Sequence, residues 1–277
     1  MTNLEKRVAV IGFGHIGSVI AGVLAEQGYN VTGIDKNKNL LDEFSKGNSP
    51  ISEPNLQNLV SRNIQNKSLA ISTNFKDVND CKVIIITVGT PLDENFNADL
   101  NNITECCEEL NEYLCDGQLI LVKSTIPPGV TKNVINKILC KNKEVEVAFS
   151  PERLAEGNAI QELKTLPIVV GGVTKKAGER GCAFWNEALG VKVINVLNSE
   201  TAEMVKLANN AWIDLNIGLA NDIARLADKL EFNIDVLEVI KAANSLKKGS
   251  NYVNILTPSS GVGGYCLTKD PLLFALS

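Results

Sequence analysis

The sequence has 277 residues, of which 44% are hydrophobic and 21% charged, enough for one large domain or two ordinary domains with hydrophobic cores. Its formal net charge of −5 provides no overall basic field, so neither nucleic acid nor an anionic membrane surface is an expected partner. No apolar run approaches the roughly 20 residues that span a bilayer, and Met1–Arg7 lacks the apolar stretch of a secretory signal. The composition therefore predicts a cytoplasmic protein without a membrane segment.

The seven cysteines are odd in number and include no C-x-x-C pair. This pattern fits neither a closed disulfide framework nor a zinc site. We expect reduced thiols and no metal, with most of the thiols buried or half-buried as small apolar side chains.

Short β-branched runs alternate with helical patterns from Arg7 to about Asn195, which is typical of a parallel sheet covered on both faces. The predicted strands are Val8–Ile11, Asn30–Ile34, Leu69–Ser72, Val83–Thr87, Leu119–Val122, Glu146–Phe149, Ile168–Gly171 and Val193–Asn195. Predicted helices between them include His15–Gln27, Pro54–Gln65 and Gly129–Leu139. Residues 1–197 are thus predicted to form an α/β, Rossmann-like domain with a doubly wound, mostly parallel sheet.

Strand signals stop after Asn195, and Ser199–Leu230 reads as one long helix with Ser199 as the expected N-cap. A shorter helix at Ile234–Asn244, a glycine-containing loop and a last helix from Leu267 follow. Residues 198–277 are therefore predicted to form an all-α central domain. We expect the long helix to form a homodimer interface, because its Ala and Leu side chains need apolar cover on more than one side.

The first predicted strand runs into Gly12-Phe13-Gly14-His15-Ile16-Gly17, at the start of the first helix. In such a turn the glycines allow a tight bend, close approach of a pyrophosphate and close helix–sheet contact. Asp35 ends the second strand, where a carboxylate grips the ribose hydroxyls and repels the extra phosphate of NADP. The sequence therefore predicts NAD as cofactor, with His15 packing locally or contacting cofactor phosphate.

Two more loops, Val88–Pro91 and Lys123–Gly129, leave the carboxyl ends of strands, where ligands bind in such sheets. Gly89, Thr90, Ser124 and Thr125 offer hydroxyls and backbone N–H groups to a dinucleotide. The same Ser and Thr side chains could instead cap the helices that follow.

Gly261–Pro271 places Cys266 after a glycine run and at the start of a helix, where the helix dipole favours a nucleophilic thiolate. Asp270 lies one helical turn further on and is expected to share a face with Cys266. An inert cysteine in a turn is the alternative for this segment taken alone.

With this segment the chain resembles the UDP-glucose/UDP-N-acetylhexosamine 6-dehydrogenase family, whose hallmark is GGYC-x-x-KD joined to an N-terminal NAD domain. Matching blocks run through the whole chain: Val88–Pro91, Lys123–Gly129, Ser150–Gly157 and Glu203–Asn210. The resemblance implies four-electron oxidation of the C6 alcohol of a UDP-sugar to a carboxylate, through a thiohemiacetal and a thioester on Cys266.

The resemblance also implies roles for other residues. Lys206 would stabilise an oxyanion and, with Asp270, handle a proton or an activating water, and Asn210 would hold the substrate or an oxyanion. Glu152 would be the acid–base for thioester hydrolysis, and Thr125 would position a water. The residues expected at the substrate are Glu152, Arg153, Leu154, Lys206, Asn210 and Gly263, and those expected at the cofactor are Gly12, Gly14, His15, Ile16, Gly17, Asp35, Gly89, Thr90, Ser124, Thr125 and Glu156.

Each role has a plainer alternative. Lys206 and Glu203 could form an exposed helix ion pair, and Glu152 and Glu156 could cap or solvate a loop. For the substrate, Arg153 stands where UDP-glucose enzymes usually have Phe, which favours UDP-N-acetylmannosamine or UDP-N-acetylglucosamine over UDP-glucose. Relatives also continue into a third, nucleotide-binding domain that this chain does not contain.

Two other functions fit part of the pattern. A two-electron hydroxyacid dehydrogenase also joins a dinucleotide fold to a helical domain, but its chemistry requires no cysteine. A noncatalytic NAD-binding dimerisation module would bind NAD without responding to any UDP-sugar.

Overall fold

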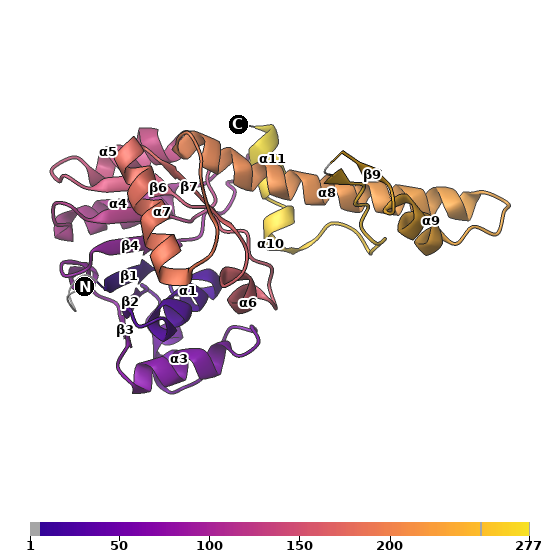
Figure 1. The fold of residues 1–277 in the computed structure, drawn as a ribbon. Coiled ribbons are helices and arrows are strands. Elements are labelled where there is room, and N and C mark those ends of the chain that lie inside the picture. The colour runs from indigo at the N-terminus through magenta and orange to yellow at the C-terminus, as the bar shows by residue number, and fades with distance from the viewer. Residues whose placement is uncertain (1–5, 250, 277) are drawn as a thin grey trace. The chain divides into compact units, whose positions relative to one another are not determined.

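One eight-stranded sheet organises the N-terminal part of the protein, in a computed structural model that describes residues 6–249 and 251–276. The strand order is β3-β2-β1-β4-β5-β6-β7-β8 (Figure 1). The strands are β1 Arg7–Ile11, β2 Asn30–Ile34, β3 Leu69–Ser72, β4 Val83–Ile86, β5 Leu119–Val122, β6 Glu146–Phe149, β7 Ile168–Gly172 and β8 Val193–Asn195. All neighbouring pairs are parallel except β6 and β7, which pair antiparallel with Phe149 opposite Gly171. The order reverses between β1 and β4, which is where ligands bind in doubly wound sheets.

Alternate residues of each central strand enter two different cores. In β1, Val8 and Val10 pack on one face, and Ala9 and Ile11 on the other. The first core is completed by α1 His15–Glu26, α2 Lys38–Ser45, α3 Leu56–Gln65, α6 Ala159–Leu163 and α7 Lys175–Leu189. The second is completed by η1 Phe75–Val78, α4 Asn101–Tyr113, the π-helical turn η2 Thr131–Ile135 and α5 Asn136–Leu139. The near-continuous apolar strands are buried because both faces are covered.

The chain divides by its internal contacts into two compact units. The first runs to Asp93 and continues from Ala98 to Lys206; the second comprises Glu94–Asn97 and the chain from Leu207 onward. The remaining elements are α8 Ser199–Lys229, α9 Val236–Ala243, the hairpin strands β9 Lys247–Lys248 and β10 Asn251–Tyr252, α10 Gly264–Leu267 and α11 Asp270–Ala275. Among the described residues, no helix is long and apolar enough to cross a membrane.

The α/β prediction is confirmed, and the predicted strands agree with the observed ones to within one residue at each end. Two local predictions were wrong. Asn198, rather than Ser199, caps α8, because its Oδ1 accepts from Thr201 N at 2.9 Å while the Ser199 hydroxyl donates to Glu200.

The second error concerns the last helix, which was predicted to run unbroken from Leu267. It is instead divided into α10 and α11, with Pro271 in the first turn of α11, where its missing N–H costs nothing. Cys266 and Asp270 therefore do not share the face of one continuous helix.

Gly17 is the glycine with the least room for a side chain in the turn after β1. A Cβ there would lie 1.8 Å from Gly12 O. We predict that Gly17→Ala lowers the free energy of unfolding by about 1–3 kcal/mol through forced displacement of backbone.

The matched control is Gly218→Ala in α8, where a Cβ meets no atom within 4 Å. That change should stabilise the helix by roughly 0.5–1 kcal/mol, since Ala loses less backbone entropy than Gly. Denaturant unfolding measures both, and a neutral Gly17→Ala would contradict the close packing of this turn.

Candidate functional site

The turn Gly12–Gly17 uses its glycines for three different purposes. Gly12 has φ +89° and donates to Ile34 O at 2.8 Å, so it bends the chain where an L side chain is strained. Gly17 packs against Gly12, whereas a Cβ on Gly14 would meet no atom within 4 Å. Ile16 packs against the adjacent core. The space beside Gly14 is therefore open for a ligand at the N-terminus of α1.

Asp35 follows β2 and holds the glycine turn directly. Its Oδ2 accepts from Phe13 N at 2.7 Å, and its Oδ1 accepts from Asn37 N at 2.8 Å. The carboxylate is half-buried. The carboxylate thus orients the glycine turn. Its expected hydrogen bonds to the ribose hydroxyls of the cofactor stay a prediction.

The loops after β4 and β5 meet at the same edge of the sheet. The buried Thr90 hydroxyl donates to Thr125 O, so Thr90 links these loops and does not cap a helix. Ser124 Oγ is buried and has no hydrogen-bond partner among the described residues, and a Cβ on Gly89 would meet nothing within 4 Å. An unpartnered hydroxyl and open backbone at Gly14 and Gly89 fit a dinucleotide at this edge. The described residues contain no cluster of His, Cys, Asp and Glu that could hold a metal ion.

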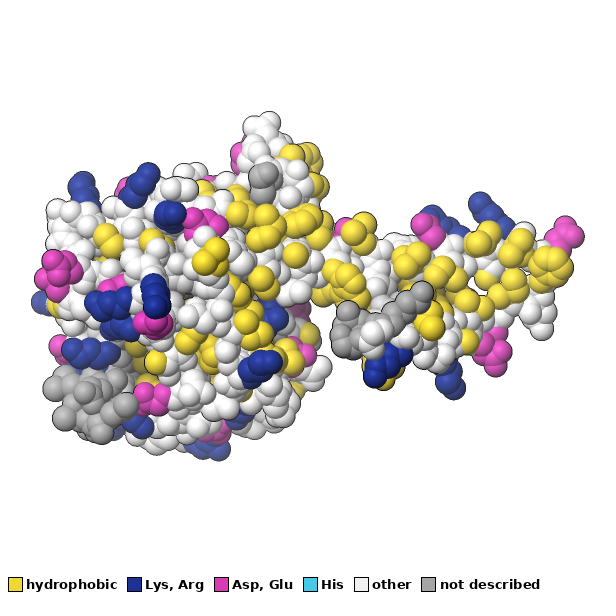
Figure 2. All heavy atoms as spheres, turned by 45° about the horizontal axis from the view of Figure 1, so that its top comes forward, with side chains coloured by type: hydrophobic (Ala, Val, Ile, Leu, Met, Phe, Trp, Pro, Cys, Tyr) yellow, Lys and Arg dark blue, Asp and Glu magenta, His cyan; other side chains and the backbone are white. Residues whose placement is uncertain are grey.

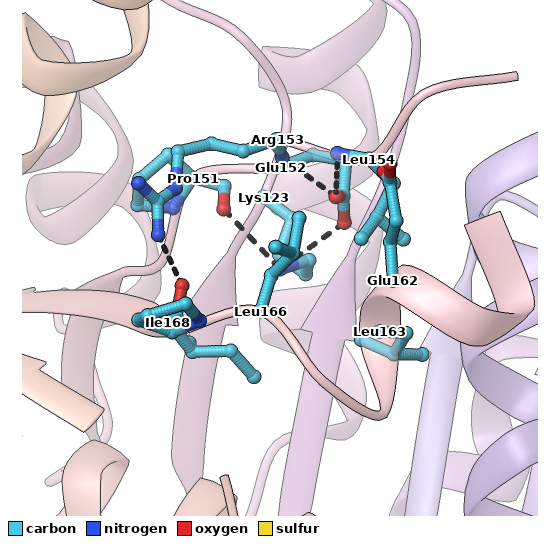
Figure 3. Close-up of a pocket in the computed structure, with 10 residues that line it drawn as sticks. Lys123, Pro151, Glu152, Arg153, Leu154, Glu162, Leu163, Leu166 and Ile168 are labelled. Carbon is cyan, nitrogen blue, oxygen red and sulfur yellow. Dashed lines mark hydrogen bonds and ion pairs between the residues drawn. The ribbon is translucent and has the colours of Figure 1, made fainter. Parts of the chain in front are cut away.

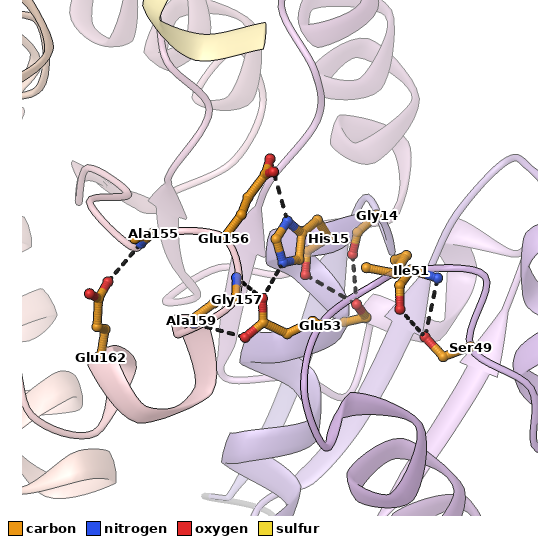
Figure 4. A network of polar contacts seen from close by, with 11 residues as sticks. Gly14, His15, Ser49, Ile51, Glu53, Ala155, Glu156, Gly157, Ala159 and Glu162 are labelled. Carbon is orange, nitrogen blue, oxygen red and sulfur yellow. Dashed lines mark hydrogen bonds and ion pairs between the residues drawn. The ribbon is translucent and has the colours of Figure 1, made fainter. Parts of the chain in front are cut away.

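His15 begins α1, and its ring lies against the buried side chain of Glu53 (Figure 4). His15 Nε2 is 2.9 Å from Glu53 Oε2, and Nδ1 is 3.9 Å from Glu156 Oε1. Glu53 was not predicted as a site residue, because the only notable local feature in the sequence is the proline that follows it. The remote pairing with His15 becomes visible only in the folded chain.

The loop after β6 carries Glu152, Arg153 and Leu154, and Lys123 at the end of β5 anchors it (Figure 3). Lys123 Nζ lies 3.3 Å from Glu152 Oε2 and donates to Ser150 O at 3.2 Å. Burial lowers the pKa of the Lys123 ammonium, and Glu152 opposes that shift. A charged residue directly after a buried strand was the available signal for Lys123, which the predicted site omitted.

The same loop is held by its own backbone. Glu152 Oε1 accepts from Arg153 N at 2.6 Å and from Leu154 N at 2.8 Å. Glu152 therefore does cap backbone N–H groups of its loop, which was the plainer alternative for this residue. The Arg153 guanidinium donates to Pro167 O, and Leu154 packs partly buried against the core. A cavity of about 20 Å³, roughly the space of one water, adjoins Lys123 and Glu152.

In α8, Glu203 and Lys206 are both buried. Glu203 accepts from Gly129 N at 2.6 Å and from Thr131 N at 2.8 Å, and burial raises its pKa although these hydrogen bonds oppose the shift. The alternative of an exposed ion pair between Glu203 and Lys206 is therefore wrong. Glu203 fixes the loop after β5 instead.

Cys266 is the third residue of α10, and its side chain is exposed. The N-cap of this helix is Gly263. Two asparagines of α8 hold the loop that leads to it: Asn216 Oδ1 accepts from Leu256 N at 2.8 Å and Asn221 Oδ1 from Ser259 N at 2.8 Å. Side-chain amides thus supply the partners that this loop lacks in regular structure.

Asp270 is buried and bonded within the same unit. Asn210 Nδ2 donates to Asp270 Oδ2 at 2.6 Å, and Lys269 Nζ lies 3.0 Å from Asp270 Oδ1. The structure thus brings together the predicted Asn210 and Asp270 and adds Lys269, which the sequence reasoning had given no role.

The other cysteines provide a contrast to Cys266. None of the seven cysteines, which all lie among the described residues, forms a disulfide bond. Burial raises the pKa of Cys81 and of Cys106 to about 12, and also raises that of Cys107. These thiols behave as small apolar groups, whereas Cys115 and Cys266 are exposed.

Comparison with known proteins gives the family. The NAD-binding domain of the UDP-glucose/GDP-mannose dehydrogenase family matches residues 6–189, and the family's central domain matches residues 200–276. This chain belongs to that family. It therefore contains the family's NAD-binding domain, in agreement with the predicted cofactor and with the resemblance read from its motifs.

Several similar proteins are named for the same activity. The chain is 37% identical over 270 residues to a UDP-N-acetyl-D-mannosamine dehydrogenase of Methanococcus maripaludis, covering 96% of this chain and 60% of that protein. A structure of UDP-D-ManNAc dehydrogenase from Pyrococcus horikoshii matches with TM-score 0.88 and 32% identity, covering 98% of this chain and 64% of that one. The UDP-N-acetyl-mannosamine dehydrogenase of Staphylococcus aureus matches with TM-score 0.81 and 30% identity over 97% of this chain and 66% of that one. The chain thus spans about 60% of the length of its curated relatives.

The open space at Gly14 generates a prediction. Gly14→Ala should leave the free energy of unfolding within about 0.5 kcal/mol of wild type, because its Cβ meets no atom. It should weaken NAD binding by at least about tenfold, since the methyl group enters the space for the pyrophosphate. Calorimetric titration with NAD, beside unfolding in denaturant, checks both. Unchanged affinity would place the dinucleotide elsewhere.

Proposed function

We propose that this chain provides the cofactor-binding and catalytic parts of an NAD-dependent UDP-sugar 6-dehydrogenase that oxidises a C6 alcohol to a carboxylate. The observation that carries the proposal is the exposed Cys266 thiol, close in sequence to the buried Asp270 cluster, in a chain with the family's NAD-binding domain. The names of the relatives support it.

A thiol explains how an alcohol can lose four electrons without release of the aldehyde. The first oxidation removes a hydride from C6 and a proton from its hydroxyl. Cys266 Sγ then bonds to the aldehyde carbon, and the carbonyl oxygen takes a proton to give a thiohemiacetal. Removal of a second hydride and a proton leaves a thioester, and water breaks the C–S bond to give the acid and the free thiol. NAD, when bound, supplies the two-electron acceptor for each oxidation.

We assign the proton and oxyanion roles to buried polar side chains. Lys206 would stabilise the oxyanion and, with Asp270, move the proton or activating water of the first oxidation, while Asn210, which already donates to Asp270, would fix the carboxylate or hold the substrate. Glu152 would be the acid–base for thioester hydrolysis, and Thr125 would position a water.

For the substrate we propose a UDP-N-acetylhexosamine, with UDP-glucose as the alternative. Arg153, next to Glu152, and the names of the relatives favour the acetylated sugar. The Arg153 guanidinium is engaged by Pro167 O, so its effect on specificity would come through the shape of the loop. Leu154, in the loop after β6, and Gly263, in the loop before Cys266, would also contact the sugar.

The stoichiometry tests the mechanism. With NAD and UDP-N-acetylmannosamine, at enzyme concentrations where slow turnover is measurable, two NADH should form per uronate. Cys266→Ser should still bind NAD but form acid at least about 100-fold more slowly, since an alkoxide is harder to generate and its ester is a poorer acyl intermediate.

Cys115→Ser is the matched control, because Cys115 is also exposed but lies outside the proposed site. It should retain the wild-type rate. One NADH per sugar would favour simple two-electron chemistry, and an undiminished yield of acid from Cys266→Ser would contradict the intermediate on Cys266. NAD binding without any response to a UDP-sugar would favour a noncatalytic module.

We also propose that α8 forms a homodimer interface. Trp212, Leu215, Leu219 and Leu226 lie on one face of α8 and are each 48–73% exposed. Figure 2 shows hydrophobic side chains gathered over α8 and α9. A second copy of this face would remove these side chains from water.

Leu215→Glu with Leu219→Glu should convert a dimer into a monomer of 29.9 kDa in sedimentation equilibrium at micromolar concentration, because two buried carboxylates per subunit oppose association. Lys175→Glu on α7, whose side chain is 91% exposed, should leave the dimer intact. A monomeric wild-type chain would contradict the proposal.

The expected cytoplasmic location stays a prediction.

A further inference from the structure

Glu53 joins two segments that lie more than 100 positions apart in the chain. It is 7% exposed and lies between α2 and α3. Its Oε2 accepts from Gly157 N at 2.8 Å and lies 2.9 Å from His15 Nε2, while its Oε1 accepts from Ala159 N at 2.9 Å. One carboxylate thus connects the glycine turn to the end of the loop that carries Glu152 and Glu156 (Figure 4).

The contact with His15 fixes where the ring carries its proton. A carboxylate only accepts, so Nε2 carries a proton in this contact. Nδ1 then faces Glu156 at 3.9 Å, but the Glu156 side chain is 83% exposed, so this second contact is weak and screened by salt. The strong part of the connection is Glu53 with His15 Nε2 and the two amides.

Other contacts hold the loop at different points. Its start is fixed by Lys123 and Glu152, and Ala155 N donates to Glu162 Oε2 at 2.6 Å. These contacts attach the loop to β5 and α6. Glu53 instead attaches its end to the turn that opens α1, so it relates the loop to the cofactor turn.

We propose that Glu53 is a positioning residue that, through His15, holds the loop 151–158 against the dinucleotide turn and so sets the affinity for NAD. The two segments are thereby arranged before the cofactor arrives, and preorganisation lowers the entropy lost on binding. Burial raises the pKa of Glu53, but the hydrogen bonds from His15, Gly157 and Ala159 outweigh it and leave the pKa lowered, so the carboxylate is ionised at neutral pH. The proposal rests on the NAD-binding domain alone and does not depend on the proposed sugar chemistry.

A purely structural role would stabilise the fold without affecting NAD. Gln118 provides the matched control, because it is also buried and also holds loops together: its Nε2 donates to Val78 O at 2.9 Å and to Cys81 O at 2.8 Å. It precedes β5 and so lies at the opposite edge of the sheet from the glycine turn.

The experiment compares Glu53→Gln, His15→Phe, His15→Gln and Gln118→Ala in the 277-residue chain, by calorimetric titration with NAD and by hydrogen exchange of the Gly157 and Ala159 amides. Glu53→Gln should raise the Kd for NAD about tenfold and speed exchange at both amides. His15→Phe should do the same to affinity, whereas His15→Gln keeps a donor and should stay within about threefold of wild type. Gln118→Ala should lower stability but leave the Kd within about twofold.

A Kd for NAD unchanged by Glu53→Gln, an equal loss of affinity in Gln118→Ala, or equal affinities of the two His15 variants would overturn the proposal. If Glu53→Gln fails to fold, the His15 pair decides, since the His15 side chain is 23% exposed. The titration uses neither a sugar nor Cys266. If the proposal about Glu53 is wrong, the two-NADH mechanism can therefore still hold. If that mechanism is wrong, the measured affinities for NAD are unaffected.

Discussion

Backbone N–H groups in the loops at the carboxyl edge of the sheet need acceptors that no strand or helix provides, and buried carboxylates supply them. Glu53 accepts from the end of the loop after β6, Glu152 from the start of that loop, and Glu203 from the loop after β5. A buried amide left without an acceptor costs roughly 1–3 kcal/mol, so these loops depend on Glu53 and Glu203 from remote parts of the chain and on Glu152 within the loop after β6. The shape of the cofactor edge therefore depends on these three carboxylates, two of which lie outside the loops that they hold.

Burial separates the candidate nucleophile from most of the other thiols. The cysteines of η1, α4 and their surroundings lie in the apolar core, where burial raises the pKa of Cys81 and Cys106 to about 12. A thiol with such a pKa is almost never ionised at neutral pH. Cys266 is exposed and follows a glycine run that asparagine side chains of α8 hold in place. The reactivity proposed for Cys266 would therefore depend on its position in the fold more than on the residue type.

The sequence predicted the strands well because each is a short β-branched run that must be buried on both faces, a local property. It failed where the outcome depends on competition between neighbours. Asn198 and Ser199 are both good caps, and only the path of the chain decides that Asn198 accepts from Thr201 N. The continuous helix predicted from Leu267 ignored the preference of Pro271 for a first turn.

The candidate site divides in the same way. Motif spacing predicted Cys266, Asp270 and the glycine turn, because each is encoded in one short segment. The pairing of His15 with Glu53 spans 38 positions and that of Lys123 with Glu152 spans 29 (152 minus 123), so neither leaves a local pattern. Such contacts follow from the sheet order, which a single sequence constrains only weakly.

The buried pair of Lys123 and Glu152 determines how variants of the proposed acid–base must be interpreted. Lys123 is 3% exposed, and its ammonium lies 5.1 Å from the centre of the Trp185 ring and 3.3 Å from Glu152 Oε2. Removing one partner of a buried ion pair costs roughly 3–5 kcal/mol, unless the remaining lysine loses its proton, which its lowered pKa favours. Glu152→Ala would also release Arg153 N and Leu154 N and so loosen the whole loop. A loss of activity in that variant would therefore not distinguish a missing base from a displaced loop, whereas Glu152→Gln keeps an oxygen for the backbone and removes mainly the charge.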